Sequence, residues 1–152
     1  MRRRILAAAL VLLALAPAAR AQTVTVEAGG QSRSLDVAAL AALPSSTATR
    51  EGRGGTRATF TGPLLWTVLR AGGGAPEYRE AARLALLVTA SDGFTAVFSL
   101  GEIAPELGAR PVILALSSDD PSAGSFPRLV LPGEERGARQ VRDVVRLTIR
   151  AP

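Results

Sequence analysis

The stretch that decides the fold is Phe60-Thr61-Gly62-Pro63-Leu64-Leu65-Trp66-Thr67-Val68-Leu69-Arg70-Ala71-Gly72. With the residues just before it, its first part (56–61) is typical of a β-strand. Gly62-Pro63 then predicts a helix start, because proline suits the first helical turn. Four apolar residues recur at helical spacing, and residues 72–74, all glycine, end the helix; the apolar four are Leu64, Leu65, Val68 and Leu69. A strand that runs directly into a short amphipathic helix is therefore expected.

The N-terminal side of this stretch predicts short elements as well. Residues 23–27 alternate as a strand that ends at the turn pair Gly29-Gly30. Asp36 is a candidate N-cap for a short helix that carries Leu35, Ala39, Leu40 and Leu43 on one side and is closed by Pro44. Residues 45–50 read as a further strand, which the glycine-rich 52–55 separates from the strand at 56–61.

The C-terminal side predicts mostly strands. Residues 81–90 and 94–98 flank Asp92-Gly93, a strong hairpin signal. Ser99 with Glu102 has the spacing of a capping box for one helical turn. Residues 110–116, 128–131 and 144–150 read as strands, and 117–125 as a polar loop. With no internal repeat or linker, we expect a single α+β domain of many short strands in mixed sheets with a few short helices.

The predicted core is apolar and spread over all of these elements. Phe94 and Trp66 have the alternative of lining a pocket, although packing is the expected role of large apolar side chains. The predicted core residues are Leu40, Leu43, Leu65, Leu69, Leu86, Val88, Phe94, Phe98, Val112, Leu114, Val130 and Val145.

The first 21 residues have the layout of a cleaved signal peptide. Arg2, Arg3 and Arg4 precede an apolar run over 5–16, and small residues flank position 20. A buried N-terminal helix is the alternative. The arginine pair also faintly resembles a twin-arginine signal, but the general export route is preferred. We expect a mature domain at 22–152 that is exported, periplasmic or secreted, with no membrane span after cleavage.

Charge and missing residue types exclude several function classes. The chain has no His, Cys or Lys, and its net charge is +5. Removal of residues 1–21 takes four arginines away and leaves the mature part near neutral, so nucleic-acid binding is not expected. Without imidazole or thiol groups there is no Ser-His-Asp triad, no reactive thiolate and no zinc site of the usual kinds. No catalytic residue and no metal ligand is therefore assigned.

Two pairs of adjacent acidic residues are candidates for calcium binding or acid/base catalysis, but exposed turns explain both of them more simply. Asp119-Asp120 lies in a Ser- and Pro-rich turn without regular calcium-ligand spacing. Glu134-Glu135 follows Pro132-Gly133 on one loop, whereas an acid/base pair needs carboxylates that oppose each other across a substrate. Solvated turns are expected at both places.

A group of arginines is the strongest candidate for binding. Arg136, Arg139 and Arg142 are spaced by three, which would place them on one side of a helical turn after Gly137, and Arg128 precedes them. Fork-shaped guanidinium groups beside free backbone N–H groups suit phosphate or sulfate. A solvated basic face is the alternative reading.

The order of several short motifs resembles the oxidoreductase molybdopterin-binding domain, whose fold is that of sulfite oxidase. These motifs cover most of residues 23–150. They are Leu40-x-x-Leu43-Pro44, the stretch from Phe60 to Gly72, Val88-Thr89-Ala90-Ser91-Asp92-Gly93-Phe94-Thr95-Ala96, Arg110-Pro111-Val112, Arg128-Leu129-Val130-Leu131-Pro132-Gly133, and Gly137-Ala138-Arg139-Gln140-Val141-Arg142. The resemblance implies a mixed α+β fold rich in short strands.

In that family a pterin dithiolene holds molybdenum and one cysteine thiolate completes the ligand shell. If Glu51-Gly52 matches the family's Glu-Gly, Thr49 stands at the cysteine position, and a threonine hydroxyl is a poor substitute for a soft thiolate. The family's phosphate-gripping Gly-x-x-Ser-Val-Lys-Trp is represented by Gly137-x-x-Gln140-Val141-Arg142-Asp143. The resemblance thus implies that the phosphate-binding part of the family's site is partly kept and that its metal-binding part is lost.

Two functions follow as hypotheses. The first is a non-catalytic, exported small stand-alone member of the fold that binds a small anion, a pterin phosphate or a protein, with no bound cofactor expected. The second is a periplasmic molybdenum-cofactor oxidoreductase, or a subunit of a redox enzyme, with an unusual ligand shell and bound molybdopterin. Docking on a periplasmic redox partner is a third reading that the sequence does not separate from ligand binding.

Overall fold

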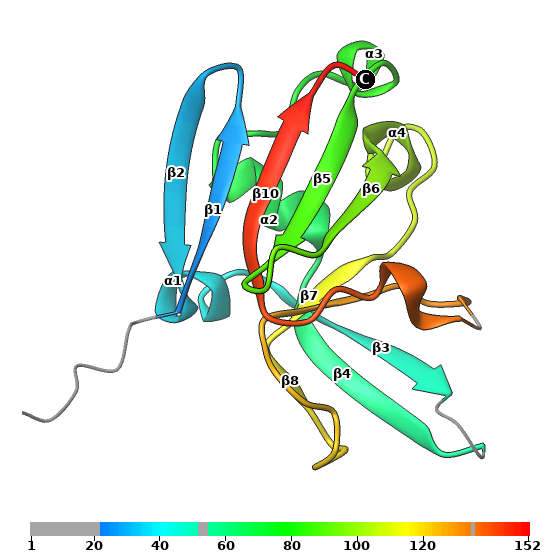
Figure 1. Cartoon of the computed structure of the whole chain (residues 1–152). Helices are drawn as coiled ribbons and strands as arrows, with labels where there is room; N and C mark the ends of the chain where they lie inside the picture. The colour runs from blue at the N-terminus through cyan, green and yellow to red at the C-terminus, as the bar shows by residue number, and fades with distance from the viewer. Residues whose placement is uncertain (1–21, 52–54, 135) are drawn as a thin grey trace, which may run out of the picture.

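The computed structural model describes residues 22–51, 55–134 and 136–152, so the predicted signal peptide at 1–21, the glycine-rich 52–54 and Glu135 lie outside the described residues. The largest element is a five-stranded mixed sheet in the order β2-β1-β10-β5-β6, in which β1 and β10 are parallel and the other neighbours antiparallel (Figure 1). Its strands are β1 (Thr23–Ala28), β2 (Gln31–Asp36), β5 (Ala85–Ala90), β6 (Thr95–Ser99) and β10 (Val144–Arg150).

Two smaller sheets form the other end of the molecule. A long β3–β4 hairpin with β8 extends away from the five-stranded sheet, and the short pair β7–β9 lies between the two (Figure 1). Their bounds are β3 (Ser45–Glu51), β4 (Arg57–Pro63), β7 (Ile113–Ala115), β8 (Ser117–Ser118) and β9 (Arg128–Val130). The α+β class and the mixed sheets predicted from the sequence are confirmed.

The helices are short and connect these strands. They are α1 (Val37–Ala41), α2 (Leu65–Ala71), α3 (Tyr78–Ala81), α4 (Leu100–Ile103) and the 3-10 helix η1 (Gly137–Arg139). Helix α2 covers one face of the five-stranded sheet (Figure 1). Asp36 caps α1 as expected, since its carboxylate accepts from the Ala39 N–H at 2.7 Å. The described residues contain no helix that is both long and apolar enough to cross a membrane.

The strand-to-helix stretch at 57–71 folds as predicted, with a later boundary. β4 continues through Gly62 and Pro63 and the helix begins at Leu65, because β4 stays paired with β3 up to Ser45–Pro63. Glycine is required at 62, since a Cβ there would lie 2.2 Å from the backbone oxygen of Leu114 in β7. Leu64, predicted on the apolar stripe, is instead outside the helix and 36% exposed.

Two hydrophobic clusters hold the chain together. The large one joins the five-stranded sheet to α2 and α4. The small one lies under the β3–β4 hairpin and consists of Ala48, Phe60, Ile113, Ala115, Ala123 and Val130. The predicted core residues that are buried are Leu40, Leu65, Leu69, Leu86, Val88, Phe98, Val112, Leu114 and Val130.

Three core predictions were wrong. Phe94 is 51% exposed because it lies in the β5–β6 turn, where its N–H donates to Asp92. Val145 is only half-buried, and Val144 is buried instead, because a register shift in β10 falls between 144 and 146. Leu43 is half-buried against the core rather than within it.

Several local predictions were also wrong. β2 was missed, so Leu35 lies on a strand rather than on the helix. Residues 81–84 are not a strand, because α3 and a turn occupy that region; likewise only Ile113–Ala115 of the predicted 110–116 is a strand. α4 exists, but Ser99 makes no side-chain capping bond. Part of the predicted polar loop 117–125 pairs with β4 as β8.

Candidate functional site: an arginine-lined cleft

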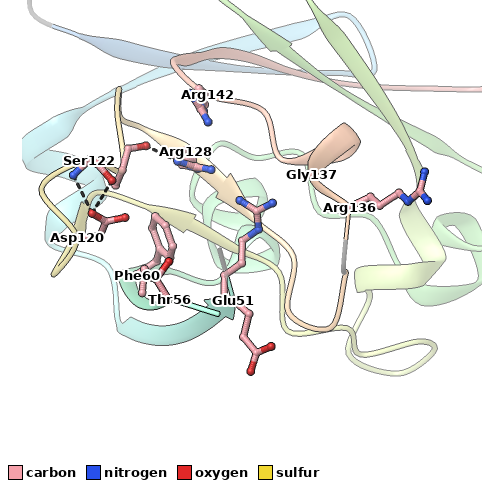
Figure 2. Close-up of a pocket in the computed structure, with 12 residues that line it drawn as sticks. Glu51, Thr56, Phe60, Asp120, Ser122, Arg128, Arg136, Gly137 and Arg142 are labelled. Carbon is pink, nitrogen blue, oxygen red and sulfur yellow. Dashed lines mark hydrogen bonds between the residues drawn. The ribbon is translucent and has the colours of Figure 1, made fainter. Parts of the chain in front are cut away.

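A cleft of about 1030 Å³ opens beside the β3–β4 hairpin (Figure 2). Its walls come from β3, β4, the loop between β8 and β9, β9 itself, and the segment around η1. Four of its lining residues are arginines and two are acidic; the charged ones are Arg50, Arg128, Arg136, Arg142, Glu51 and Asp120. The cleft is therefore predominantly cationic.

Arg128 is the most buried charged residue of the cleft. It begins β9, is 3% exposed, and its guanidinium carbon lies 5.1 Å from the centre of the Phe60 ring. One of its terminal nitrogens donates to the Ala123 carbonyl, whereas its Nε is buried and has no hydrogen-bond partner in the part of the chain that the structure describes. Within the described residues, no carboxylate lies at ion-pair distance from this guanidinium.

The surroundings of Arg128 oppose its positive charge. Burial is the main cause that lowers its pKa, and the nearby charges of Arg142 and Arg50 lower it further, while Asp120 raises it slightly; the resulting pKa is about 10. A group with this pKa is still charged at neutral pH. A buried cation without a paired anion is costly, since burial of a charge is normally compensated by a partner. The cleft thus holds a desolvated positive charge that has no ion-pair partner among the described residues.

Arg50 approaches the cleft from β3. Ala48 is buried and Thr49 exposed, so by strand alternation Arg50 shares the inward face of Ala48. Its Nε is buried and has no hydrogen-bond partner within 22–51, 55–134 and 136–152. A Cβ on Gly137 would lie 2.7 Å from a terminal nitrogen of Arg50, so this glycine lets the guanidinium lie against η1.

Arg142 and Arg136 come from the two sides of η1. Arg142 is exposed, lines the cleft, and lies near Gly124, at 3.7 Å from its ideal Cβ position. Arg136 also lines the cleft, but in Figure 2 its guanidinium points away from Arg128 and Arg142. We call Arg50, Arg128 and Arg142 the open cluster.

Arg139 lies beside carboxylates rather than other arginines. We call Arg139, Arg110, Glu102 and Glu134 the paired cluster. It forms ion pairs with Glu134 and, at 3.4 Å, with Glu102, and Glu134 also pairs with Arg110 at 3.4 Å. Burial would lower the pKa of Arg139, but hydrogen bonds and charges from Glu134 and then Glu102 outweigh it, so the pKa is raised. Its guanidinium lies 4.8 Å from the Phe98 ring.

The predicted single helical face for Arg136, Arg139 and Arg142 was wrong. Only Gly137–Arg139 are helical, so Arg142 lies beyond the turn and Arg139 turns toward the carboxylates. The structure therefore gathers Arg128, Arg136 and Arg142 at the cleft and separates Arg139 from them.

The acidic pairs have structural roles in the described residues. Asp119 accepts from the Thr59 N–H at 2.8 Å, and Asp120 accepts from the N–H and hydroxyl of Ser122 at 2.8 and 2.7 Å. These bonds from Ser122 lower the pKa of Asp120. Glu134 is not the solvated residue expected, since its side chain is 16% exposed and held by arginines.

Thr49 faces away from the cleft. It pairs in register with Thr59, whereas Arg50 pairs with Ala58 and the lining residues Arg50, Ala58 and Phe60 share the other face. If the sequence match to the family's cysteine position holds, the side chain at that position is not directed into the cleft. No three metal-ligating side chains come together within 22–51, 55–134 and 136–152.

Arg50 was missed in the sequence. It lies far in the sequence from Arg128 and Arg142, and only the pairing of β3 with β4 brings it to the cleft. The alternation of side chains along the predicted strand at 45–50 could have indicated it. Arg50 is two residues from Ala48 and therefore shares its face of the strand.

The comparisons with known proteins show the fold. No protein-family model matches the chain, and no curated protein matches it. Among solved structures, it is similar to the sulfane dehydrogenase SoxCD from Paracoccus pantotrophus, with a TM-score of 0.61 and 19% identity over 84% of this chain. The chain spans 37% of the length of that protein. The sulfite-oxidase-like fold implied by the sequence resemblance is confirmed.

Proposed function

We propose that this chain is an exported, non-catalytic binding module that takes a small anion, such as a phosphate-bearing pterin or another organic phosphate, in the arginine-lined cleft. One observation carries the proposal: Arg128 is 3% exposed, has no carboxylate partner among the described residues, and is flanked by two further arginines. A phosphate would supply the missing counter-charge and accept from several guanidinium groups at once.

The energetics favour an anion over water in this place. Assembling Arg50, Arg128 and Arg142 costs like-charge repulsion in every folded molecule, and a bound dianion turns that repulsion into attraction. Because Arg128 is already fixed over Phe60, little side-chain freedom is lost when the anion binds. A preorganised cleft of this kind gains affinity from both effects.

The residues present fit one end of the molybdenum cofactor and not the other. The open cluster suits the phosphate end of the pterin. The metal end needs a soft thiolate, and the chain contains neither Cys nor His, while Thr49 faces away from the cleft. We therefore derive no reaction step through molybdenum.

A cofactor-dependent oxidoreductase, or a redox-enzyme subunit, is the second candidate, and the fold likeness to a sulfane dehydrogenase favours it. Molybdenum analysis of the protein purified from its native source decides between the two. Stoichiometric metal would contradict a non-catalytic module, whereas metal-free protein that still binds phosphate compounds would support it.

Export is proposed from the arginine, apolar and small-residue order of residues 1–21. N-terminal sequencing of the protein from a periplasmic or culture fraction tests it. A mature terminus near residue 22 supports export, and full-length protein in the cytoplasm contradicts it.

Thermal unfolding with pyrophosphate tests the cleft. A ligand at 100 times its Kd stabilises the folded state by about 2.7 kcal/mol, which is a rise of roughly 5–10 °C in a domain of this size. Sodium chloride at equal ionic strength is the control for screening. Arg142→Gln, an exposed change that should leave the fold intact, should remove most of the rise.

Arg33→Gln, an exposed change on β2, is the matched control and should keep the full pyrophosphate response. Equal responses in Arg142→Gln and Arg33→Gln, or an equal rise with chloride, would contradict the proposed site.

A further inference from the structure

A second, smaller groove lies away from the arginine-lined cleft and shares no lining residue with it. Its volume is about 440 Å³, within the range of small-molecule sites. It is formed by the start of α2 and the segment from α4 to β7. Its described lining residues are mostly apolar and none is acidic: Pro44, Leu64, Trp66, Thr67, Arg70, Ile103, Pro105, Ala109, Arg110, Pro111 and Val112.

Trp66 forms part of the wall of this groove. It is 8% exposed, and its Nε1 is buried with no hydrogen-bond partner among the residues that the structure describes. Indole N–H groups usually find an acceptor when buried. Leu64, 36% exposed at the start of α2, adds an apolar surface that the fold itself leaves uncovered. The groove thus has walls that are largely apolar.

The charges of the groove are all positive. Arg70, exposed at the end of α2, has no ion-pair partner among the described residues. Arg110 forms one ion pair with Glu134 at 3.4 Å, and a guanidinium has five N–H donors. Both cations are therefore able to contact an anionic group in the groove.

The wall that carries Arg110 is held rigidly. The N–H groups of Gly108, Ala109 and Arg110 donate to carbonyls of 101, 104 and 102 at 2.9, 3.0 and 2.9 Å. Ala109 has a φ of 49°, which is unusual for a residue with a side chain and tends to occur at functional places. A fixed backbone holds the groove open without a ligand.

We propose that this groove binds a small amphiphile that has one apolar chain and one carboxylate. The apolar walls would cover the chain, and Arg70 and Arg110 would contact the carboxylate. This site is independent of anion binding in the arginine-lined cleft.

Trp66 is the only tryptophan of the chain, so its fluorescence reports on this groove directly. The test titrates the protein with decanoate below its micelle concentration, and with decyltrimethylammonium as the probe of the same tail and opposite charge. We expect a saturable change with decanoate at one molecule per chain, and none with the cationic probe.

Three variants complete the test. Arg70→Gln should weaken decanoate binding about tenfold, the loss expected for one charge-assisted contact. Leu64→Glu, which brings a negative charge to the groove, should abolish the binding. Arg142→Gln, in the other cleft, should bind decanoate like the unmodified chain.

The results separate the two proposals. Equal binding of both probes, or unchanged binding in Arg70→Gln and Leu64→Glu, would overturn the groove. Loss of decanoate binding in Arg142→Gln would overturn its independence from the cleft. Absence of any pyrophosphate response would leave a decanoate result intact.

Discussion

Arg128 and Arg139 both lie over aromatic rings, but the charged side chains around them have opposite signs. Each guanidinium lies over a buried phenylalanine ring, at 5.1 Å from Phe60 and 4.8 Å from Phe98 respectively. Arg139 has Glu134 and Glu102 as ion-pair partners, and its pKa is raised. Burial, and then the charges of Arg142 and Arg50, lower the pKa of Arg128 to about 10.

The difference teaches which basic residues are structural. The paired cluster joins α4, Arg110 and the segment before η1 through Glu134, and Arg139 is neutralised within the fold by two carboxylates. The open cluster leaves its charges unbalanced at the wall of a cleft. We infer that the first holds the η1 segment in place and that the second is available to a ligand.

The largest expected effect comes from breaking the paired cluster. Glu134→Gln should lower the free energy of unfolding by about 2 kcal/mol, because a half-buried carboxylate that serves two arginines is neutralised. Urea denaturation measures the change. Glu51→Gln, which breaks the exposed pair with Arg57, is the control and should cost less than about 0.5 kcal/mol. Equal losses would refute the structural role of Glu134.

A smaller effect should follow when the open cluster is given a carboxylate. Ala58 pairs with Arg50 across the hairpin and lines the cleft. Ala58→Glu should raise the free energy of unfolding by about 1 kcal/mol at low salt, since it introduces a partner for unpaired cations. It should also abolish the pyrophosphate response. Ala58→Gln, with the same shape and no charge, should do neither; a rise in both variants would point to packing instead.

At alkaline pH, the lowered pKa of Arg128 should change the free energy of unfolding by a similar or smaller amount. The pKa of Arg128 is about 10 in the folded chain, below that of an unperturbed guanidinium, because burial and the charges of Arg142 and Arg50 lower it. Between these values the unfolded chain holds the extra proton, so the contribution of Arg128 makes stability rise with pH. The rise is at most about 1.4 kcal/mol per pH unit.

Unfolding of the unmodified chain and Arg128→Met at pH 9, 10 and 11 measures this rise as a difference. No Lys, Cys or His titrates in that range, because the chain has none. As the pH rises, the free energy of unfolding of the unmodified chain should increase relative to that of Arg128→Met. Its stabilisation by pyrophosphate should weaken over the same range. A difference that stays constant from pH 9 to 11 would show that Arg128 keeps an ordinary pKa.

The two faces of the β3–β4 hairpin should differ in how pyrophosphate affects the labelling of a thiol, with the smallest effect on stability. Thr49→Cys and Ala58→Cys each place one thiol in a chain without cysteine. Pyrophosphate should slow the labelling of Cys at 58 and leave Cys at 49 unaffected, because only position 58 lines the cleft. Protection at both positions would mean that Thr49 also faces the bound anion.

The sequence predicted the elements whose signals are local. The Asp92-Gly93 hairpin, the Asp36 cap and the strand-to-helix stretch before Gly72 all depend on neighbours in the chain. β2 was missed because its residues are mostly polar, and it is held as a strand by pairing with β1. Tertiary pairing overrode local pattern there.

The candidate site was predicted only in part for the same reason. Spacing predicts Arg136 and Arg142 as members of the site, Arg128 precedes them, and all three line the cleft. Spacing alone gave Arg139 equal weight, because the ion pair with Glu102 joins segments far apart in the chain. Arg50 reaches the cleft through the β3–β4 pairing, which no short motif encodes.

The central claim is that Arg128 is an unpaired binding charge and Arg139 a paired structural one. Its most direct test is urea unfolding of Arg128→Met and Arg139→Met, each with and without pyrophosphate. We predict that Arg139→Met loses about 2 kcal/mol and keeps the pyrophosphate stabilisation, whereas Arg128→Met loses no stability and no longer responds. A loss of similar size in both variants, with the pyrophosphate response intact in Arg128→Met, would contradict the account.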